Sequence, residues 1–175
     1  MRSIWSGIGG GPVAATLLAL AAVACGRSEP VDTLPAEGAV IEEIEMLIEA
    51  QVAAWNSGDI EGFTSVYSDD CKFLSPSGLT QGRQQVLDRY RRRYPGQAAM
   101  GTLRFEFIEM VPMTMEVRSL MGLLKKEGIG GVTVAARWYL SYPDREAASG
   151  LTLIVFKRLA GTWQIIQDAS MSDEE

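Results

Sequence analysis

The sequence predicts an α+β domain in which a curved antiparallel sheet wraps around three N-terminal helices to form a cone. Two observations support this prediction. Residues 51–95 read as the end of one helix, a short second helix, a tight hairpin and a third helix. Three or four segments with strand-like alternation then follow, up to residue 170. This order is typical of a sheet that bends around helices and encloses a pocket.

The first helix is predicted from a strict three-four spacing of apolar residues, with glutamates on the opposite face. Gly58 follows the helix and suits a left-handed cap. The apolar positions are Val40, Ile41, Ile44, Leu47, Ile48, Val52 and Trp55.

A short second helix follows, for which Asp59 is a suitable N-cap and Tyr67 shares a face with Ile60 and Phe63. Short strands at residues 71–75 and 79–81 flank a Pro-Ser-Gly turn. The third helix is expected from Arg83 to Tyr94 and ends before Pro95.

Long strands are expected at residues 102–111, 132–140, 151–157 and 163–170. The alternation of apolar residues changes phase after Phe107, which predicts a β-bulge that bends the strand there. Residues 113–131 contain methionines, leucines and paired lysines. They are interpreted as a short amphipathic helix or flexible lid, or alternatively as a long surface loop.

Composition restricts the chemistry that this chain can perform. Its 175 residues contain no histidine, which removes histidine-activated nucleophiles, histidine general bases and histidine metal ligands. We predict no metal site and no cofactor. The formal net charge of −6 argues against a nucleic-acid partner.

Residues 1–24 are predicted to be a secretory signal, because the apolar run from Val13 to Ala24 is too short to span a bilayer. Small residues precede Cys25 as in a bacterial lipobox, which predicts lipid attachment at Cys25 and a tether over residues 25–37. Ordinary cleavage after Ala24 and a retained anchor are the alternatives. Cys71 is expected to be a small buried residue.

Several short motifs carry a resemblance to a known superfamily. They are Ala54–Asp59, Tyr67–Asp70, Ser75–Gly78, Gly82-Arg83, Arg137-Trp138 and Trp163–Ser170. In this order they resemble the nuclear transport factor 2-like superfamily over a domain of residues 38–172. The chain looks most like the bacterial group related to the association domain of calcium/calmodulin-dependent kinase. Ketosteroid isomerases and polyketide cyclases share the fold, and the resemblance implies a homodimer formed through the open sheet face.

The resemblance weakens a catalytic interpretation. In ketosteroid isomerases the residue before the hairpin proline is the aspartate that moves the proton, and here it is Ser75. Relatives of the kinase-associated group usually carry a histidine where this chain has Ala169. Asp168 remains as a weak catalytic candidate. On strict alternation it lies on the opposite face from Trp163 and Ile165, where it can pair with Arg137, contact a ligand, or act as an acid or base.

An apolar pocket is predicted where the helices meet the sheet. Its residues either line a ligand site or simply fill the cone. Arginines on the third helix form a basic cluster that could hold an anion or be a solvated helix face. The predicted pocket residues are Trp55, Tyr67, Phe73, Ser75, Tyr90, Phe105, Arg137, Tyr139 and Asp168.

The leading functional hypothesis is an exported, dimeric lipoprotein that faces the periplasm or cell exterior, is held to the membrane by lipid on Cys25, and binds a small apolar ligand. The first alternative is a small-molecule isomerase or cyclase that uses Asp168 with Tyr67, Tyr90 or Tyr139. The second is a protein assembly module that uses residues 113–131 as its contact.

Overall fold

The computed structural model describes residues 36–118 and 125–173, which belong to a compact unit of residues 34–175. The predicted signal and Cys25 lie outside the described residues. The helices are α1 (Glu37–Asn56), α2 (Ile60–Thr64), α3 (Arg83–Arg93) and α4 (Gln97–Met100). The strands are β1 (Tyr67–Ser75), β2 (Gly78–Gln81), β3 (Thr102–Arg118), β4 (Lys125–Ser141), β5 (Ala148–Leu159) and β6 (Thr162–Ser172).

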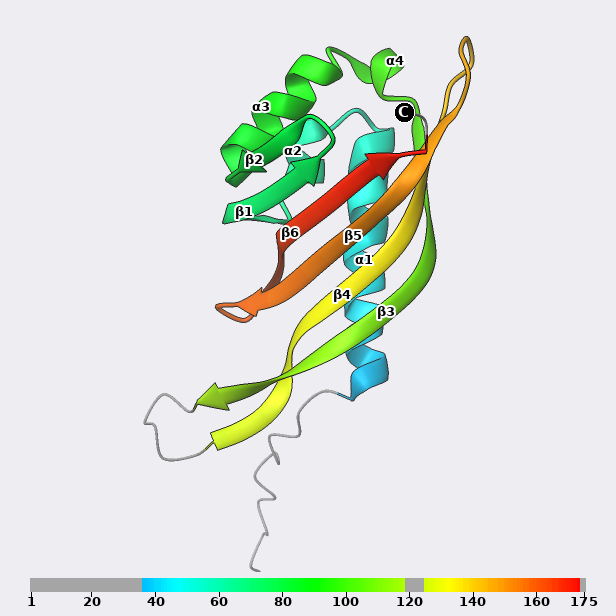
Figure 1. Ribbon diagram of the computed structural model, residues 1–175. Coiled ribbons are helices and arrows are strands. Elements are labelled where there is room, and N and C mark those ends of the chain that lie inside the picture. The colour runs from blue at the N-terminus through cyan, green and yellow to red at the C-terminus, as the bar shows by residue number, and fades with distance from the viewer. Residues whose placement is uncertain (1–35, 119–124, 174–175) are drawn as a thin grey trace, which may run out of the picture. The chain divides into compact units, whose positions relative to one another are not determined.

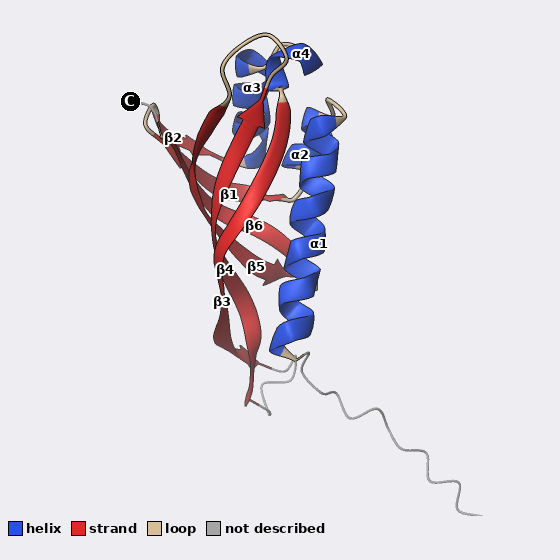
Figure 2. Cartoon of the chain, turned by 90° about the vertical axis from the view of Figure 1, so that its right-hand side faces the viewer, coloured by secondary structure: helices blue, strands red, loops and turns tan. Residues whose placement is uncertain are grey.

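The strands form one sheet in the order β2-β1-β6-β5-β4-β3. Neighbouring strands are antiparallel except β1 and β6, which run parallel. Figures 1 and 2 show a strongly bent sheet with α1 along one face and α3 and α4 gathered at one end. The predicted α+β cone is therefore confirmed.

The core lies between α1 and the concave face of the sheet. The predicted three-four spacing buries one side of α1, and alternating residues of β4, β5 and β6 meet it from the sheet. None of the helices in the described residues has the length and apolar character needed to cross a membrane. The fully buried contributors include Val40, Ile44 and Ile48 from α1, Val132 and Val134 from β4, Phe156 from β5 and Ile165 from β6.

The predicted caps between α1 and α2 are confirmed. Gly58 adopts a φ of +83°, where a side chain would be strained. The Asp59 side chain accepts a hydrogen bond from the backbone N–H of Gly62 at 2.8 Å. α2 is shorter than predicted, however, and Tyr67 begins strand β1 instead of sharing a helix face with Phe63. The backbone N–H of Ile165 donates to the Val66 carbonyl at 2.9 Å, so pairing with β6 extends β1 toward its start.

Two bulges decide which way the side chains of the long strands point. The predicted bulge in β3 is confirmed, because the pairing with β4 shifts between Phe107 and Glu109. A second bulge lies in β6, where Ile165 and Gln167 pair with consecutive residues of β5. The extra residue, Ile166, reverses the alternation after it. Asp168 therefore lies on the same buried face as Ile165, and the prediction that it lies on the opposite face is wrong.

The expectation of a helix, lid or loop at residues 113–131 is also wrong over the described residues. Residues 113–118 continue β3 and residues 125–131 begin β4, and the two strands pair through to Arg118 and Lys125. Interstrand hydrogen bonds extend the ladder, with a further register shift between Met113 and Thr114, through a segment whose methionines and glycines show no clear alternation. Residues 119–124 lie outside the described residues.

Candidate functional site

A cavity of about 500 Å³ lies between the helices and the concave face of the sheet, within the size range of small-molecule sites. Every described strand except β2, together with α1, α2 and α3, contributes to its walls. Its lining residues are Gln51, Trp55, Phe63, Tyr67, Phe73, Ser75, Pro76, Ser77, Arg89, Tyr90, Arg93, Tyr94, Leu103, Phe105, Trp138, Leu140, Thr152, Ile154, Asp168, Ser170 and Ser172.

The helical wall of the cavity is a cluster of aromatic side chains. The Trp55 ring meets Phe63, Tyr90 and Tyr94 edge-on, with centroid distances of 4.9, 5.8 and 4.8 Å. Tyr90 also meets Phe73 edge-on at 5.9 Å and so connects α3 to β1. Edge-to-face pairs add roughly 0.5–1.5 kcal/mol each beyond burial, which gives this wall a fixed shape.

A carboxylate is buried at the inner end of the cavity, which we define as Asp168, Tyr67 and Thr152. Asp168 is only 6% exposed. The Tyr67 hydroxyl donates to Asp168 Oδ2 at 2.6 Å, and the Thr152 hydroxyl donates to Asp168 Oδ1 at 2.8 Å. Each carboxylate oxygen therefore has a donor from the protein, which offsets the cost of taking the group out of water.

Burial dominates the acid-base properties of the inner end. It raises the pKa of Asp168 above its usual value, although the hydrogen bonds from Tyr67 and Thr152 oppose the shift. Burial, reinforced by the charge of Asp168, also raises the pKa of Tyr67 and that of Tyr90 well above the usual value. Both tyrosines therefore keep their hydroxyl protons near neutral pH. Because each hydroxyl carries a single hydrogen, each tyrosine can donate one hydrogen bond.

The part of the cavity lined by α3 and the β1–β2 hairpin carries positive charge at a position that we call the rim, defined as Ser75, Ser77, Arg89 and Arg93. Arg89 Nη2 donates to the Ser75 and Ser77 hydroxyls at 2.9 and 2.8 Å. The guanidinium carbon of Arg89 lies 5.3 Å from the centre of the Phe73 ring. The hairpin between β1 and β2 therefore holds Arg89 in a defined orientation, and Arg93 lies one helical turn further along α3.

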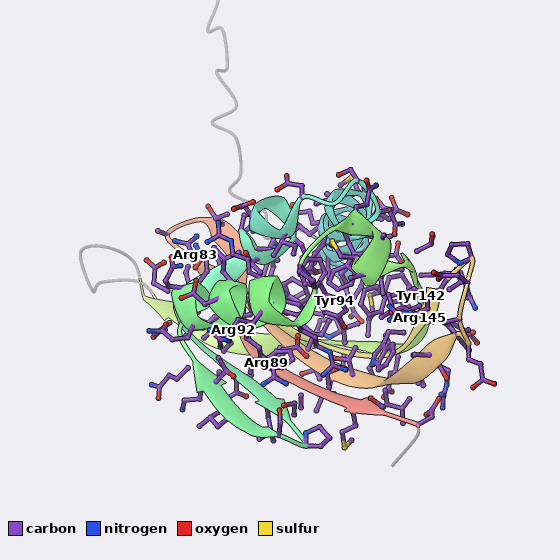
Figure 3. All side chains as sticks on the ribbon, turned by 90° about the horizontal axis from the view of Figure 1, so that it is seen from above. Arg83, Arg89, Arg92, Tyr94, Tyr142 and Arg145 are labelled. Atoms are coloured by element: carbon purple, nitrogen blue, oxygen red, sulfur yellow. The ribbon has the colours of Figure 1, made fainter. Side chains whose placement is uncertain are left out.

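The two rim arginines differ from most other arginines of the described residues. Ion pairs engage Arg83, Arg91, Arg104, Arg137 and Arg158 with nearby carboxylates. Within residues 36–118 and 125–173, no ion pair engages either arginine of the rim. Figure 3 looks down on α3 and shows Arg83 at one end of the helix, with Arg89 and Arg92 further along it.

Most of the predicted pocket residues line this cavity, but two do not. Arg137 and Tyr139 alternate along β4 with Trp138 and Leu140, which line the cavity, so they point to the other face of the sheet. Their placement in the pocket is therefore wrong. The residues found in the cavity are Trp55, Tyr67, Phe73, Ser75, Tyr90, Phe105 and Asp168.

The expected pairing of Asp168 with Arg137 is also wrong. Arg137 forms an ion pair with Asp173, which also accepts from the Ser149 hydroxyl at 2.5 Å. Asp168 turns inward because of the β6 bulge, whereas Arg137 stays on the outer face. Tyr139 likewise lies away from Asp168, and its hydroxyl donates to Glu106 at 3.0 Å.

Sequence reasoning missed Thr152, Trp138 and the role of two arginines. Thr152 alternates with Ile154 and Phe156 along β5, a pattern that could have placed its hydroxyl on the buried face. Arg89 and Arg93 were recognised only as part of a basic cluster, because nothing in the sequence shows which arginines of α3 find carboxylates.

The described residues contain no cluster of three or more acidic or cysteine side chains that could hold a metal ion. Cys71 is fully buried, as expected, and burial raises the pKa of its thiol. Two lining residues, Trp55 and Trp138, have buried indole N–H groups that donate to no acceptor in the described part of the chain.

A family model for the SnoaL-like domain matches residues 48–162, about two thirds of the chain. The chain belongs to the SnoaL-like domain family. The match begins within α1 and ends at the start of β6, so it includes the part of α1 that lines the cavity and all of α2 and α3. No curated protein matches the chain significantly.

Solved structures extend this similarity to the nuclear transport factor 2-like fold. A protein of unknown function from Shewanella oneidensis is 22% identical with a TM-score of 0.62, covering 75% of this chain and 98% of its own. A putative calcium/calmodulin-dependent protein kinase II association domain from Xanthomonas campestris is 15% identical with a TM-score of 0.54, covering 82% and 94%. A ketosteroid isomerase-like protein from Erwinia carotovora is 17% identical with a TM-score of 0.50, covering 75% and 95%.

These similarities confirm the predicted superfamily and the fold. All three identities lie below 25%, so they establish the architecture and leave the activity to be argued from the site itself.

Proposed function

We propose that this protein binds a small, mostly apolar molecule in its cavity and does not convert it. The observation that carries the proposal is a cavity of about 500 Å³ with an interlocked aromatic wall and polar side chains at defined positions. Transfer of an apolar ligand from water to this wall contributes about 25 cal/mol per Å² of buried apolar surface.

The polar groups of the cavity favour binding over catalysis. Tyr67 and Thr152 both donate to Asp168, so each of its oxygens is already engaged by the protein before a substrate enters. Ser75, at the position of the isomerase aspartate, is a hydroxyl that accepts a hydrogen bond from Arg89. A serine beside a guanidinium has no base to activate it, so proton abstraction at this position is not supported.

We also propose that the domain is a homodimer through the convex face of its sheet. Leu151 and Leu153 of β5 and Met171 of β6 are 38%, 47% and 56% exposed, although they are large and apolar. Leu151 pairs with Met171 and Leu153 pairs with Ala169, so these side chains form neighbouring apolar positions on one face. Covering such a face by a second copy removes apolar surface from water.

Export and lipid attachment at Cys25 remain part of the proposal, and they rest on the sequence pattern of residues 13–26. In this arrangement the tether of residues 25–37 would link the domain to the membrane on the periplasmic or outer side. Mass spectrometry of the protein from its own host should give an N-terminal peptide that begins at Cys25 and carries acyl chains. An unmodified peptide beginning at Cys25 would instead indicate ordinary secretion.

Native mass spectrometry of the protein purified from its own host, released from detergent, tests binding and assembly together. A dimer that carries a reproducible extra mass supports the binding function. Replacing Ser170, a small lining residue, with Phe should remove the extra mass, whereas Leu153→Glu should give a monomer that keeps it. An empty dimer or a higher oligomer would contradict the binding function and favour the assembly module.

A second candidate function is proton transfer on a small apolar carbonyl compound. The observation that favours it is a carboxyl group with a raised pKa next to a buried Tyr hydroxyl inside an apolar cavity. Asp168 would move the proton and Tyr90, whose side chain also lines the cavity, would donate to the developing oxyanion. Deuterium uptake at the α carbon of 2-tetralone, followed by NMR, tests this. Asp168→Asn should abolish the uptake, whereas Asp173→Asn, which changes a carboxylate outside the cavity, should retain it. Uptake that does not exceed the buffer rate would exclude this function for such ketones.

A further inference from the structure

The two ends of the cavity differ in electrostatic character. At the rim, Arg89 and Arg93 bring two positive charges without carboxylate partners among the described residues. At the inner end, Asp168 is a buried acid whose environment disfavours added negative charge. An anionic group entering the cavity is thus attracted to one end and repelled from the other.

Arg89 is oriented for recognition by the protein itself. Its Nη2 group donates to Ser75 and Ser77, and its guanidinium lies over the Phe73 ring. The N–H groups on Nη1 and Nε donate to no described residue, so they are available to an acceptor in the cavity. An arginine that is already held in place loses less conformational entropy when it binds a planar anion than a solvated one does.

The rim arginines combine two features. They have no carboxylate partner among the described residues, which is also true of Arg92, and they line the cavity, which Arg92 does not. The chain is acidic, with 22 acidic and 16 basic residues, and other arginines on α3 do find partners. Arg83 pairs with Asp69 and Arg91 pairs with Glu61, so carboxylates within reach of this helix are used where they are present. Two cationic groups beside an aromatic cavity are the complement of a molecule with an apolar body and one anionic group.

We infer that the cavity binds an amphipathic acid, with its anionic group at the rim against Arg89 and Arg93 and its apolar body between the aromatic side chains toward Asp168. This inference rests on the proposed binding function and specifies its ligand class. Ser75 then has a definite role, because its hydroxyl orients the arginine that binds the anion. The position that carries a proton-abstracting aspartate in ketosteroid isomerases is used here for charge recognition.

The test uses two ligands of the same shape, 1-naphthaleneacetate and its neutral analogue 1-naphthaleneacetamide. Each is titrated by calorimetry into the full-length protein in a nonionic detergent, and the heat from protein-free micelles is subtracted. We expect the acetate to bind more tightly than the amide. Raising the salt concentration should weaken binding of the acetate and leave binding of the amide unchanged, because the rim is open to solvent.

Variants assign the charge preference to the rim. Arg89→Gln should weaken acetate binding roughly tenfold, as expected for a lost hydrogen bond to a charged group, and leave amide binding unchanged. Arg92→Gln removes the same charge from the same helix at a residue that does not line the cavity, and it should change neither affinity. Arg93→Gln removes the other rim charge from an exposed side chain. It should also weaken acetate binding and leave amide binding unchanged, and it serves as the test if Arg89→Gln perturbs the hairpin.

Every outcome of these titrations either supports or overturns the inferred ligand class. Equal affinities for acetate and amide, or equal losses in Arg92→Gln and Arg89→Gln, would overturn the inference and leave the cavity as a binding site for neutral molecules. If neither compound binds the wild-type protein, the proposed binding of ring-bearing apolar molecules fails and the inference fails with it. Loss of both ligands in Ser170→Phe confirms that they occupy the cavity.

Discussion

The inner end and the rim of the cavity are both polar, but they satisfy their polar groups differently. At the inner end, Asp168 receives one hydrogen bond on each oxygen and is shielded from water. At the rim, Arg89 is held by two serines and its charge has no carboxylate partner among the described residues. The hydrogen bonds at the inner end are complete within the fold and stabilise the core. The charge at the rim is complemented only when a ligand binds.

The comparison predicts that changes at the aromatic wall and inner end affect stability, and that changes at the rim affect binding. The largest effect is expected for Trp55→Ala, because Trp55 is buried and contacts three other aromatic rings. We expect the free energy of unfolding to fall by about 3–5 kcal/mol. Urea unfolding monitored by circular dichroism measures this; a loss below about 1 kcal/mol would mean that the wall is not fixed by packing.

The next effect is expected for Tyr67→Phe, which leaves Asp168 Oδ2 without its donor in a buried site. The cost should be about 1–3 kcal/mol, and the pKa of Asp168 should rise further because an opposing hydrogen bond is lost. Tyr139→Phe is the matched control, since its hydroxyl bonds to exposed Glu106, and it should cost less than about 0.5 kcal/mol. Equal costs in the two variants would remove the distinction between the buried network and the surface.

Asp168→Asn should change how stability depends on pH. The folded pKa of Asp168 is raised above its unfolded value of about 3.9, so between these two values the folded state holds more protons. The contribution of Asp168 to stability is therefore fully present below about pH 4 and is lost as pH rises through the folded pKa. Asparagine does not titrate, so the advantage of the wild type over Asp168→Asn should be largest at low pH.

Thermal unfolding of both proteins between about pH 3.5 and 8 measures this difference, and carboxylates common to both cancel. An advantage of the wild type that grows with rising pH would show that Asp168 is stabilised as the charged form. The hydrogen bonds from Tyr67 and Thr152 would then outweigh its burial.

The smallest effect is expected for Ser77→Ala at the rim. Ser77 is exposed and accepts one of the two hydrogen bonds from Arg89, so stability should change by less than about 0.5 kcal/mol. Acetate binding should weaken by a few-fold, because Arg89 keeps its charge and loses only part of its orientation. A stability loss comparable to that of Tyr67→Phe would place the rim among the structural parts of the fold and not the recognition groups.

The sequence by itself determined the order of elements, because caps and hydrophobic periods are local signals. The spacing from Val40 to Trp55, the glycine at 58 and the phase change after Phe107 each fix a nearby feature, and the structure shows all three. The same local signals placed seven of the nine expected pocket residues on the cavity wall.

Only the tertiary structure decided which polar groups meet. The bulge at Ile166 turns Asp168 inward and separates it from Arg137, because one additional residue reverses every later side chain of a strand. The pairing of Asp168 with Tyr67 joins residues 101 positions apart. Which arginines of α3 have carboxylate partners depends on Asp69 and Glu61 in other elements, and this long-range geometry leaves Arg89 and Arg93 to face the cavity.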